Sequence, residues 1–209
     1  MVRMRLSTAF LVAFLASAVF AILHSGGLHA APSAKATTQP GIVVLFRGGA
    51  NIFSTGMDEL ADKLRDKGVN ATSVGHATWK QGAADARADY AKRKQPIVFV
   101  GHSFGANAAV LAAQELGKSN IPVSLVVLYD PTTVLKAPSN VRHLVNYYSR
   151  TVNGLGLEVQ PGMHFSGLLE NLGQADVGHL EIDNDVRLQD QTIAQILRAL
   201  GRRASASRD

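Results

Sequence analysis

The segment Gly101-His102-Ser103-Phe104-Gly105 is the part of this chain whose residue types and spacing best suit chemistry. A serine hydroxyl becomes a nucleophile when an imidazole within hydrogen-bond reach accepts its proton. The flanking glycines allow a turn too tight for side chains, which holds Ser103 in a strained conformation. The backbone N–H of Phe104 opens the following helix and can face a negative charge that develops on a substrate oxygen. We therefore predict Ser103 as a nucleophile and Phe104 N–H as an oxyanion donor.

Local signals on both sides of this segment predict the elements that position it. Residues 96–100, Pro-Ile-Val-Phe-Val, form an apolar, β-branched run typical of a buried strand. Residues 106–116 are rich in Ala and Leu and stop before Gly117, which is a helix C-cap signal. A strand, the Gly-x-Ser-x-Gly pattern and a helix in this order expose a serine hydroxyl at the end of a sheet.

The base that accepts the serine proton is expected among the seven histidines of the chain. Two of them fall in the N-terminal segment, His102 is expected to point away from the nucleophile, and His143 lies in a predicted strand. Three candidates remain: His76, His164 and His179. We prefer His179 because it lies in a long loop directly before the last predicted helix, and His164 stays the alternative.

The acid that orients the imidazole is expected at the end of a neighbouring strand. Asp130 directly follows an apolar strand predicted over residues 121–129. The carboxyl ends of parallel strands meet at one edge of a sheet, where functional side chains collect. We therefore predict Asp130 as the acid, with Glu158 and Asp176 as alternatives. The competing interpretation is that Asp130 caps the turn at Pro131.

With these motifs the chain resembles the α/β-hydrolase superfamily, in particular small secreted or envelope-associated bacterial members that carry Gly-His-Ser-x-Gly and lack a lid domain. The resemblance covers about residues 41–200. It is most specific in residues 101–105, called the elbow segment below, and in the chain order Ser103, Asp130, His179. It implies an α/β fold in a minimal form, with a mostly parallel central sheet and helices on both faces. It also implies a serine esterase, lipase or thioesterase that needs no cofactor.

The resemblance extends to loops near the nucleophile. The loop after the first strand contains Gly48 and Gly49 and is expected to supply the second oxyanion donor. Because this loop departs from the His-Gly-Gly-Gly form of the family, the N–H that donates stays open. His76, Trp79 and His164 are candidates for the pocket, while the competing interpretation of Trp79 is packing on the rim of the domain.

Alternating strands and helices predict the remaining architecture. Strands are expected over residues 42–46, 69–74, 96–100, 121–129 and 141–148, with an edge strand over 155–159; helices are expected from Ser54 or Thr55 to about Gly68, and over 83–94, 106–116 and 186–200. Residues 161–178 are expected to form a glycine-rich loop. We expect Asp183 and Asp185 to cap the last helix rather than to bind an ion, so no metal site is predicted.

The first residues predict export rather than fold. A basic start at Arg3 and Arg5, an apolar run and small residues after it predict a signal peptide over residues 1–30, followed by a linker over 31–40. The alternative is an uncleaved inner-membrane anchor formed by residues 6–23. In the first case the protein is periplasmic or secreted, and in the second the domain is tethered to the membrane.

Composition narrows the class of protein further. The chain of 209 residues has no cysteine, which excludes disulfides and favours a bacterial envelope protein over a small disulfide-stapled domain. Its length suits one domain, expected over residues 41–200 with a basic tail over 201–209. The net charge of +5 is partly carried by that tail, but the basic segments have no interleaved aromatic residues, so nucleic-acid binding is not expected. The oligomeric state is not predicted.

These features together predict a hydrolase that cleaves carboxylic ester or thioester bonds of a small-molecule or lipid-like acyl substrate through an acyl-Ser103 intermediate. One rival is another acyl-transfer chemistry, either amide hydrolysis or transfer to an envelope acceptor. A second rival is a non-catalytic or weakly catalytic envelope or virulence-accessory binding protein on the same fold. Membrane contact is expected only through the N-terminal segment, if it stays uncleaved.

Overall fold

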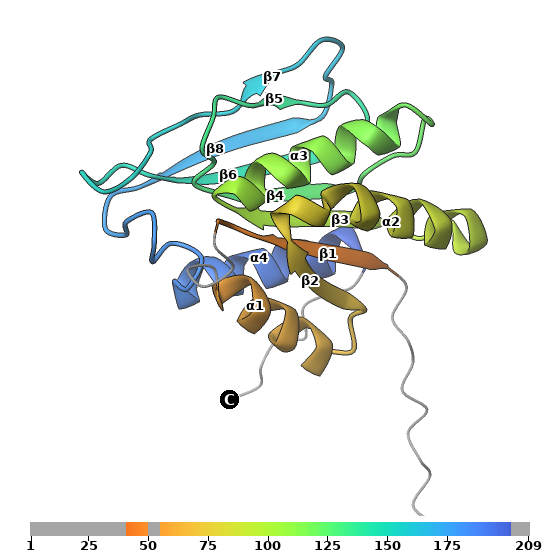
Figure 1. Ribbon diagram of the computed structural model, residues 1–209, viewed down its shortest axis with the longest axis horizontal. Helices are drawn as coiled ribbons and strands as arrows, with labels where there is room; N and C mark the ends of the chain where they lie inside the picture. Colours follow the sequence, from red (N-terminus) through yellow and green to blue (C-terminus); the bar gives the residue numbers. More distant parts are fainter. Residues whose placement is uncertain (1–40, 50–54, 202–209) are drawn as a thin grey trace, which may run out of the picture. The chain divides into compact units, whose positions relative to one another are not determined.

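The computed structural model describes residues 41–49 and 55–201 (Figure 1). The predicted signal peptide, the linker and the tail beyond residue 201 lie outside the described residues, as does Ser54. The elements in chain order are β1 (Ile42–Arg47), α1 (Thr55–Asp66), β2 (Ala71–Gly75), the 3-10 helix η1 (His76–Thr78), α2 (Trp79–Arg93), β3 (Ile97–His102), α3 (Phe104–Gly117), β4 (Leu125–Tyr129), β5 (Lys136–Ala137), β6 (His143–Ser149), β7 (Gln160–Pro161), β8 (Leu168–Gln174) and α4 (Val186–Ala199).

A six-stranded sheet forms the centre of the domain, with the strand order β2-β1-β3-β4-β6-β8. Every neighbouring pair in this sheet is parallel. The carboxyl ends of the strands therefore meet at one edge, which is where ligands collect in open α/β sheets. β5 and β7 form a separate two-stranded parallel pair. The predicted α/β class with a parallel central sheet is confirmed.

Helices cover both faces of the sheet, with α2 and α3 on one face and α1 and α4 on the other (Figure 1). Successive residues of β1 alternate between the two cores: Val44 and Phe46 pack on the α2–α3 side, and Val43 and Leu45 pack on the α1–α4 side. This alternation follows from the two-residue period of a strand. The apolar residues at helical spacing on one side of each of these helices are buried: Met57, Leu60, Ala61 and Leu64 of α1, and Leu188, Ile193, Ile196 and Leu197 of α4.

β8 is the outer strand next to β6, opposite β2, and the predicted edge strand over residues 155–159 is wrong. β8 lies within the stretch 161–178 that the sequence indicates as a loop, so that prediction is also wrong in part. Asn171 of β8 gives a physical reason, because its side chain accepts from Val159 N at 2.9 Å and donates to Val159 O at 2.9 Å. The Asn171 side chain, and not a neighbouring strand, therefore makes the backbone hydrogen bonds of Val159. β8 itself is only partly buried and tolerates polar residues and a glycine, which hide it from a hydrophobic pattern.

Two predicted boundaries also shift. β4 begins at Leu125 rather than at Ile121, and Pro122 explains this difference because it has no N–H to donate to a central ladder. α2 begins at Trp79, directly after η1, and not near residue 83. The helix therefore starts at the carboxyl edge of the sheet, next to the end of β2.

Candidate active site

Ser103 occupies the turn between β3 and α3 with φ 58° and ψ −124°, a strained conformation for a residue with a side chain. Close backbone approaches explain the two flanking glycines. A Cβ on Gly101 would overlap the Gly105 carbonyl, and a Cβ on Gly105 would overlap the carbonyl oxygen of Phe46 in β1. α3 begins at Phe104, so the Phe104 N–H belongs to the first turn and has no acceptor within the helix.

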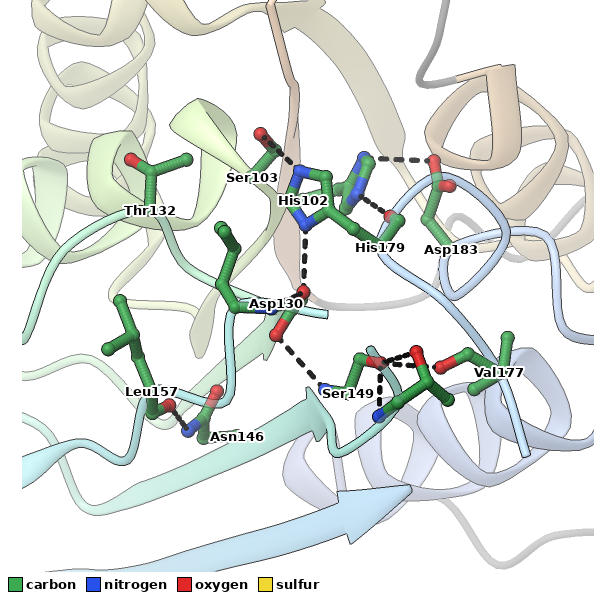
Figure 2. Close-up of polar contacts among 12 residues, drawn as sticks. His102, Ser103, Asp130, Thr132, Asn146, Ser149, Leu157, Val177, His179 and Asp183 are labelled. Carbon is green, nitrogen blue, oxygen red and sulfur yellow. Dashed lines mark hydrogen bonds and ion pairs between the residues drawn. The ribbon is translucent and has the colours of Figure 1, made fainter. Parts of the chain in front are cut away.

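Ser103, His179 and Asp130 form one chain of hydrogen bonds (Figure 2). Ser103 Oγ lies 3.1 Å from His179 Nε2, and His179 Nδ1 lies 2.8 Å from Asp130 Oδ2. Because an ionised carboxylate only accepts, Nδ1–H donates to Asp130 and Nε2 is left to accept from the serine hydroxyl. The three side chains come from the β3–α3 turn, the loop between β8 and α4, and the end of β4.

The surroundings of Asp130 favour the ionised carboxylate. Its side chain is fully buried, and besides His179 it accepts hydrogen bonds at 3.0 Å from the N–H of Ser149 and at 3.0 Å from the N–H of Leu155. Burial alone would raise the pKa of Asp130, but the hydrogen bonds from His179 and the two backbone N–H groups outweigh burial and hold this pKa below its usual value. Asp130 is therefore charged at neutral pH and able to stabilise a positive imidazole.

Ser149 joins the loop that supports Asp130 to the loop that carries His179. Its hydroxyl donates to Val177 O at 2.7 Å and accepts from Thr151 N at 3.3 Å, while its own N–H donates to Asp130. His179 N donates to Asn153 O at 3.2 Å, which is a second link between the same two loops. These bonds satisfy buried polar groups and restrict the position of the imidazole.

Gly48 and Gly49, which directly follow β1, lie beside Phe104. His76 Nδ1–H donates to Gly48 O at 3.0 Å, and the His76 ring stacks on the Phe104 ring with 5.6 Å between centroids. A Cβ on Gly49 would lie 3.1 Å from the Phe104 ring. Gly48, Gly49 and His76 therefore lie next to the residue that follows Ser103.

The alternative acids have other partners. Glu158 accepts a hydrogen bond from Tyr148 OH at 2.7 Å on the surface, and Asp176 lies 3.5 Å from Arg187. Within the described ranges, neither carboxylate forms a hydrogen bond with His179. Their environments explain why Asp130 is the carboxylate that reaches the imidazole.

Two of the predicted pocket residues lie apart from this hydrogen-bond chain. His164 is exposed, follows β7 and, among the residues that the structure describes, has no hydrogen bond to Ser103 or Asp130. Trp79 is partly buried against the α2–α3 core and lines a cavity of about 320 Å³ with Lys80, Ala84, Arg87, Glu115 and Lys118. These residues lie in α2, in α3 and directly after α3. This position of Trp79 fits the competing interpretation, in which it packs on the rim of the domain.

His102 and Asp183 are two buried residues near the site whose contacts the sequence does not reveal. His102 does point away from Ser103, and its Nε2–H donates to His179 O at 2.8 Å (Figure 2). Asp183 Oδ2 lies 3.5 Å from His102 Nδ1. Burial lowers the pKa of His102 to about 4 and raises the pKa of Asp183 to about 7.

The prediction that Asp183 caps the last helix is wrong. Asp185 is the N-cap of α4, because its Oδ1 accepts from Leu188 N at 2.9 Å. The Asp183 side chain is instead fully buried and faces His102. Two aspartates so close in sequence before one helix look equivalent, and only the burial of one separates them.

Two further results concern the described part of the chain alone. No cluster of three or more His, Cys, Asp or Glu side chains in it could hold a metal ion. Likewise, none of the helices within residues 55–201 is long and apolar enough to cross a membrane.

Comparison with solved structures gives the fold. The chain is similar to human thioesterase 2, with 13% identity, a TM-score of 0.54, and coverage of 78% of this chain and 96% of that one. It is also similar to Est1E from Butyrivibrio proteoclasticus, with 13% identity, a TM-score of 0.52, and coverage of 79% and 90%. A cutinase-like protein from Cryptococcus sp. matches with 17% identity, a TM-score of 0.51, and coverage of 79% and 97%. No protein-family model and no curated protein sequence matches.

These likenesses show that the chain has the α/β-hydrolase fold, as the elbow segment and the order of Ser103, Asp130 and His179 predict. Identities of this size show the fold and leave the chemistry to the residues. The function must therefore be argued from the geometry around Ser103.

Proposed function

We propose that the protein is a serine hydrolase that cleaves carboxylic ester or thioester bonds through an acyl-Ser103 intermediate. The observation that carries the proposal is the hydrogen-bond chain from Ser103 Oγ through His179 to the buried carboxylate of Asp130. A serine at φ 58° directly before a helix, with a base at 3.1 Å, has the geometry of an activated nucleophile.

In the proposed first half-reaction, Ser103 Oγ attacks the acyl carbon while its proton moves to His179 Nε2. The imidazolium that forms keeps its Nδ1–H bond to Asp130, whose negative charge stabilises it. His179 then gives its proton to the leaving alcohol or thiol as the bond to the acyl carbon breaks. The products of this half-reaction are the acyl-Ser103 ester and the free leaving group.

In the second half-reaction, water attacks the acyl carbon while His179 Nε2 accepts a proton from it. His179 then gives this proton to Ser103 Oγ as the bond from Oγ to the acyl carbon breaks, which regenerates the hydroxyl and releases the acid. In both halves a negative charge develops on the carbonyl oxygen. We propose that Phe104 N–H and an N–H of the Gly48–Gly49 loop bind this oxygen. Each such donor contributes about 3 to 4 kcal/mol to transition-state stabilisation in comparable sites.

The side chains around the site favour an apolar acyl group, either of a small molecule or of a lipid-like substrate. Phe104, which follows Ser103, is 52% exposed, and Leu180, which follows His179, is 54% exposed. Leu155, whose N–H binds Asp130, is 43% exposed. Exposed apolar side chains therefore adjoin each member of the proposed triad, and a hydrocarbon chain would cover them on binding.

A fluorophosphonate probe tests the proposal, because it labels only an activated serine. Wild-type protein should be labelled once per chain, and Ser103→Ala should abolish labelling and lower ester turnover by several orders of magnitude while the fold persists. His179→Ala should cost nearly as much, whereas His164→Ala is the matched control that keeps activity. A wild type that is neither labelled nor able to hydrolyse p-nitrophenyl esters of any chain length would instead favour a binding protein on this fold.

We also propose that the domain acts outside the cytosol. The support is the sequence of residues 1–30, with a basic start, an apolar run and a small-residue cleavage site. Substrates would then be acyl compounds of the bacterial envelope or of the medium.

A further inference from the structure

His102 and Asp183 are buried titratable side chains that the proposed reaction does not use. His102 is 1% exposed and Asp183 is fully buried. They form a line of polar contacts that ends on the base: Asp183 Oδ2 lies 3.5 Å from His102 Nδ1, and His102 Nε2–H donates to His179 O at 2.8 Å (Figure 2). Burial of two such groups is costly, so their arrangement calls for a physical reason.

His102 links Ser103 to His179 by a second route, which does not involve the hydrogen bonds among the Ser103, His179 and Asp130 side chains. It is the last residue of β3 and directly precedes Ser103, so its backbone belongs to the same rigid turn. His179, in contrast, lies between β8 and α4 in a stretch, residues 175–185, with no strand or α-helix. The bond from His102 therefore ties the main chain of a loop residue to the strand that carries the nucleophile.

Asp183 is itself fixed from two helices. A Cβ on Gly56, in the first turn of α1, would overlap the Asp183 carbonyl, so α1 packs directly on this backbone. From α4, Gln189 Nε2 donates to Asp183 O at 2.7 Å and to Gly56 O at 3.2 Å. The main chain of Asp183 behind His102 thus has a defined position.

We propose that His102 is a positioning residue, buried beside Asp183, that fixes the His179 main chain so that Nε2 stays within reach of Ser103 Oγ. This inference rests on the proposed serine hydrolase function. The distance that must be kept is the 3.1 Å between His179 Nε2 and Ser103 Oγ. A misplacement of about 1 Å in such a contact can cost about 100-fold in rate.

The buried environment suits this role because it keeps His102 neutral. The ring centroids of His102 and His179 are 5.1 Å apart, so a positive charge on His102 would oppose the imidazolium on His179 during the reaction. Burial lowers the pKa of His102 to about 4, which leaves a neutral ring with Nε2–H as the donor at neutral pH. His102 therefore supplies a hydrogen bond without a competing charge.

Two amide substitutions separate the contact with His179 from the contact with Asp183. In His102→Gln the amide nitrogen reaches the position of Nε2 and still donates to His179 O, whereas in His102→Asn it reaches only the position of Nδ1. We expect His102→Asn to lower kcat for a p-nitrophenyl ester about 10- to 100-fold with KM changed less than about twofold, because His102 is buried away from substrate. His102→Gln should restore kcat to within about fivefold of wild type.

Thr192→Val is the matched control for lost buried hydrogen bonding. Thr192 is buried in α4, and its Oγ1 lies 2.6 Å from Tyr129 OH; among the residues that the structure describes, no hydrogen bond joins it to Ser103, Asp130 or His179. This variant should lower the melting temperature by as much as His102→Asn does and leave kcat unchanged. Equal kcat in His102→Asn and in wild type, or equal losses in the Asn and Gln variants, would overturn the positioning role.

A second readout keeps this test independent of the proposed function. The Nδ1 proton that His179 shares with Asp130 at 2.8 Å should give a low-field proton NMR signal, sharp in wild type and in His102→Gln and broadened or lost in His102→Asn. Failure of the phosphonate to label wild type would refute the hydrolase function alone. An unchanged signal in His102→Asn would refute the positioning of His179, whether or not the protein is an enzyme.

Discussion

Replacing Asp130 by Asn tests the electrostatic core of the proposed site, because an amide cannot reproduce what the carboxylate does there. Asp130 accepts three hydrogen bonds, from His179 Nδ1 and the N–H of Leu155 at Oδ2 and from the N–H of Ser149 at Oδ1. An amide has one oxygen and one NH₂ group. In either orientation, the NH₂ of the variant faces at least one group that must donate.

Each orientation of the amide has its own cost. With the amide oxygen toward His179, the Ser149 N–H loses its acceptor, which costs about 1 to 3 kcal/mol of stability. With the NH₂ toward His179, it donates to Nδ1 and moves the imidazole proton to Nε2, so the base can no longer accept from Ser103. The first orientation keeps the His179 tautomer but loses the negative charge of the carboxylate. In the second orientation His179 can no longer act as the base. We therefore expect kcat to fall about 10²- to 10⁴-fold.

The same variant has a defined pH dependence of stability. Hydrogen bonds hold the pKa of Asp130 below its ordinary value of 3.8, so its stabilising effect is present above that pH and is lost as pH falls through the lower pKa of the folded protein. The difference in unfolding free energy between wild type and Asp130→Asn should be full at neutral pH and narrow below about pH 4. Urea denaturation at several pH values measures it.

Steady-state kinetics with a p-nitrophenyl ester measures the catalytic effect, with Glu158→Gln and Asp176→Asn as matched controls. Both control carboxylates lie on the surface with other partners, so these variants should keep wild-type kcat. Full activity in Asp130→Asn, or a comparable loss in Glu158→Gln, would refute the reasoning that Asp130 is the acid.

Three further predictions concern packing, stability and location. Gly105→Ala should destabilise the domain by about 3 kcal/mol or more, since the added methyl group meets the Phe46 carbonyl and not a flexible side chain; soluble protein with an unchanged melting temperature would contradict this. Burial raises the pKa of Asp183 from 3.8 to about 7, so ionisation of Asp183 destabilises the folded wild type as pH rises between these values. Asp183→Asn should therefore become more stable relative to wild type over that range. An equal difference in unfolding free energy between the two proteins at pH 5 and at pH 8, measured by urea denaturation, would argue against it. N-terminal sequencing of protein released by osmotic shock should begin near Ala31, whereas an intact Met1 in the membrane fraction would show the anchor and recovery in the cytosol would exclude export.

Sequence alone determined the parts of this protein that depend on near neighbours along the chain. The elbow around Ser103 is legible because an apolar strand, two glycines and an Ala-rich helix stand side by side in the sequence. The buried faces of α1 and α4 follow from helical spacing. The position of Asp130 after a strand and that of His179 before a helix predict both residues, and the structure brings them into contact with each other.

The tertiary structure alone decided which polar groups meet across large separations in the chain. β8 forms one edge of the sheet, and the Asn171 side chain rather than a neighbouring strand makes the hydrogen bonds of the Val159 backbone. Asp183 faces His102 inside the protein, although its sequence context equals that of an ordinary helix cap. Local patterns record the preference of a segment for helix, strand or turn, but the partner of a hydrogen bond and the burial of a charge depend on segments that only folding brings together.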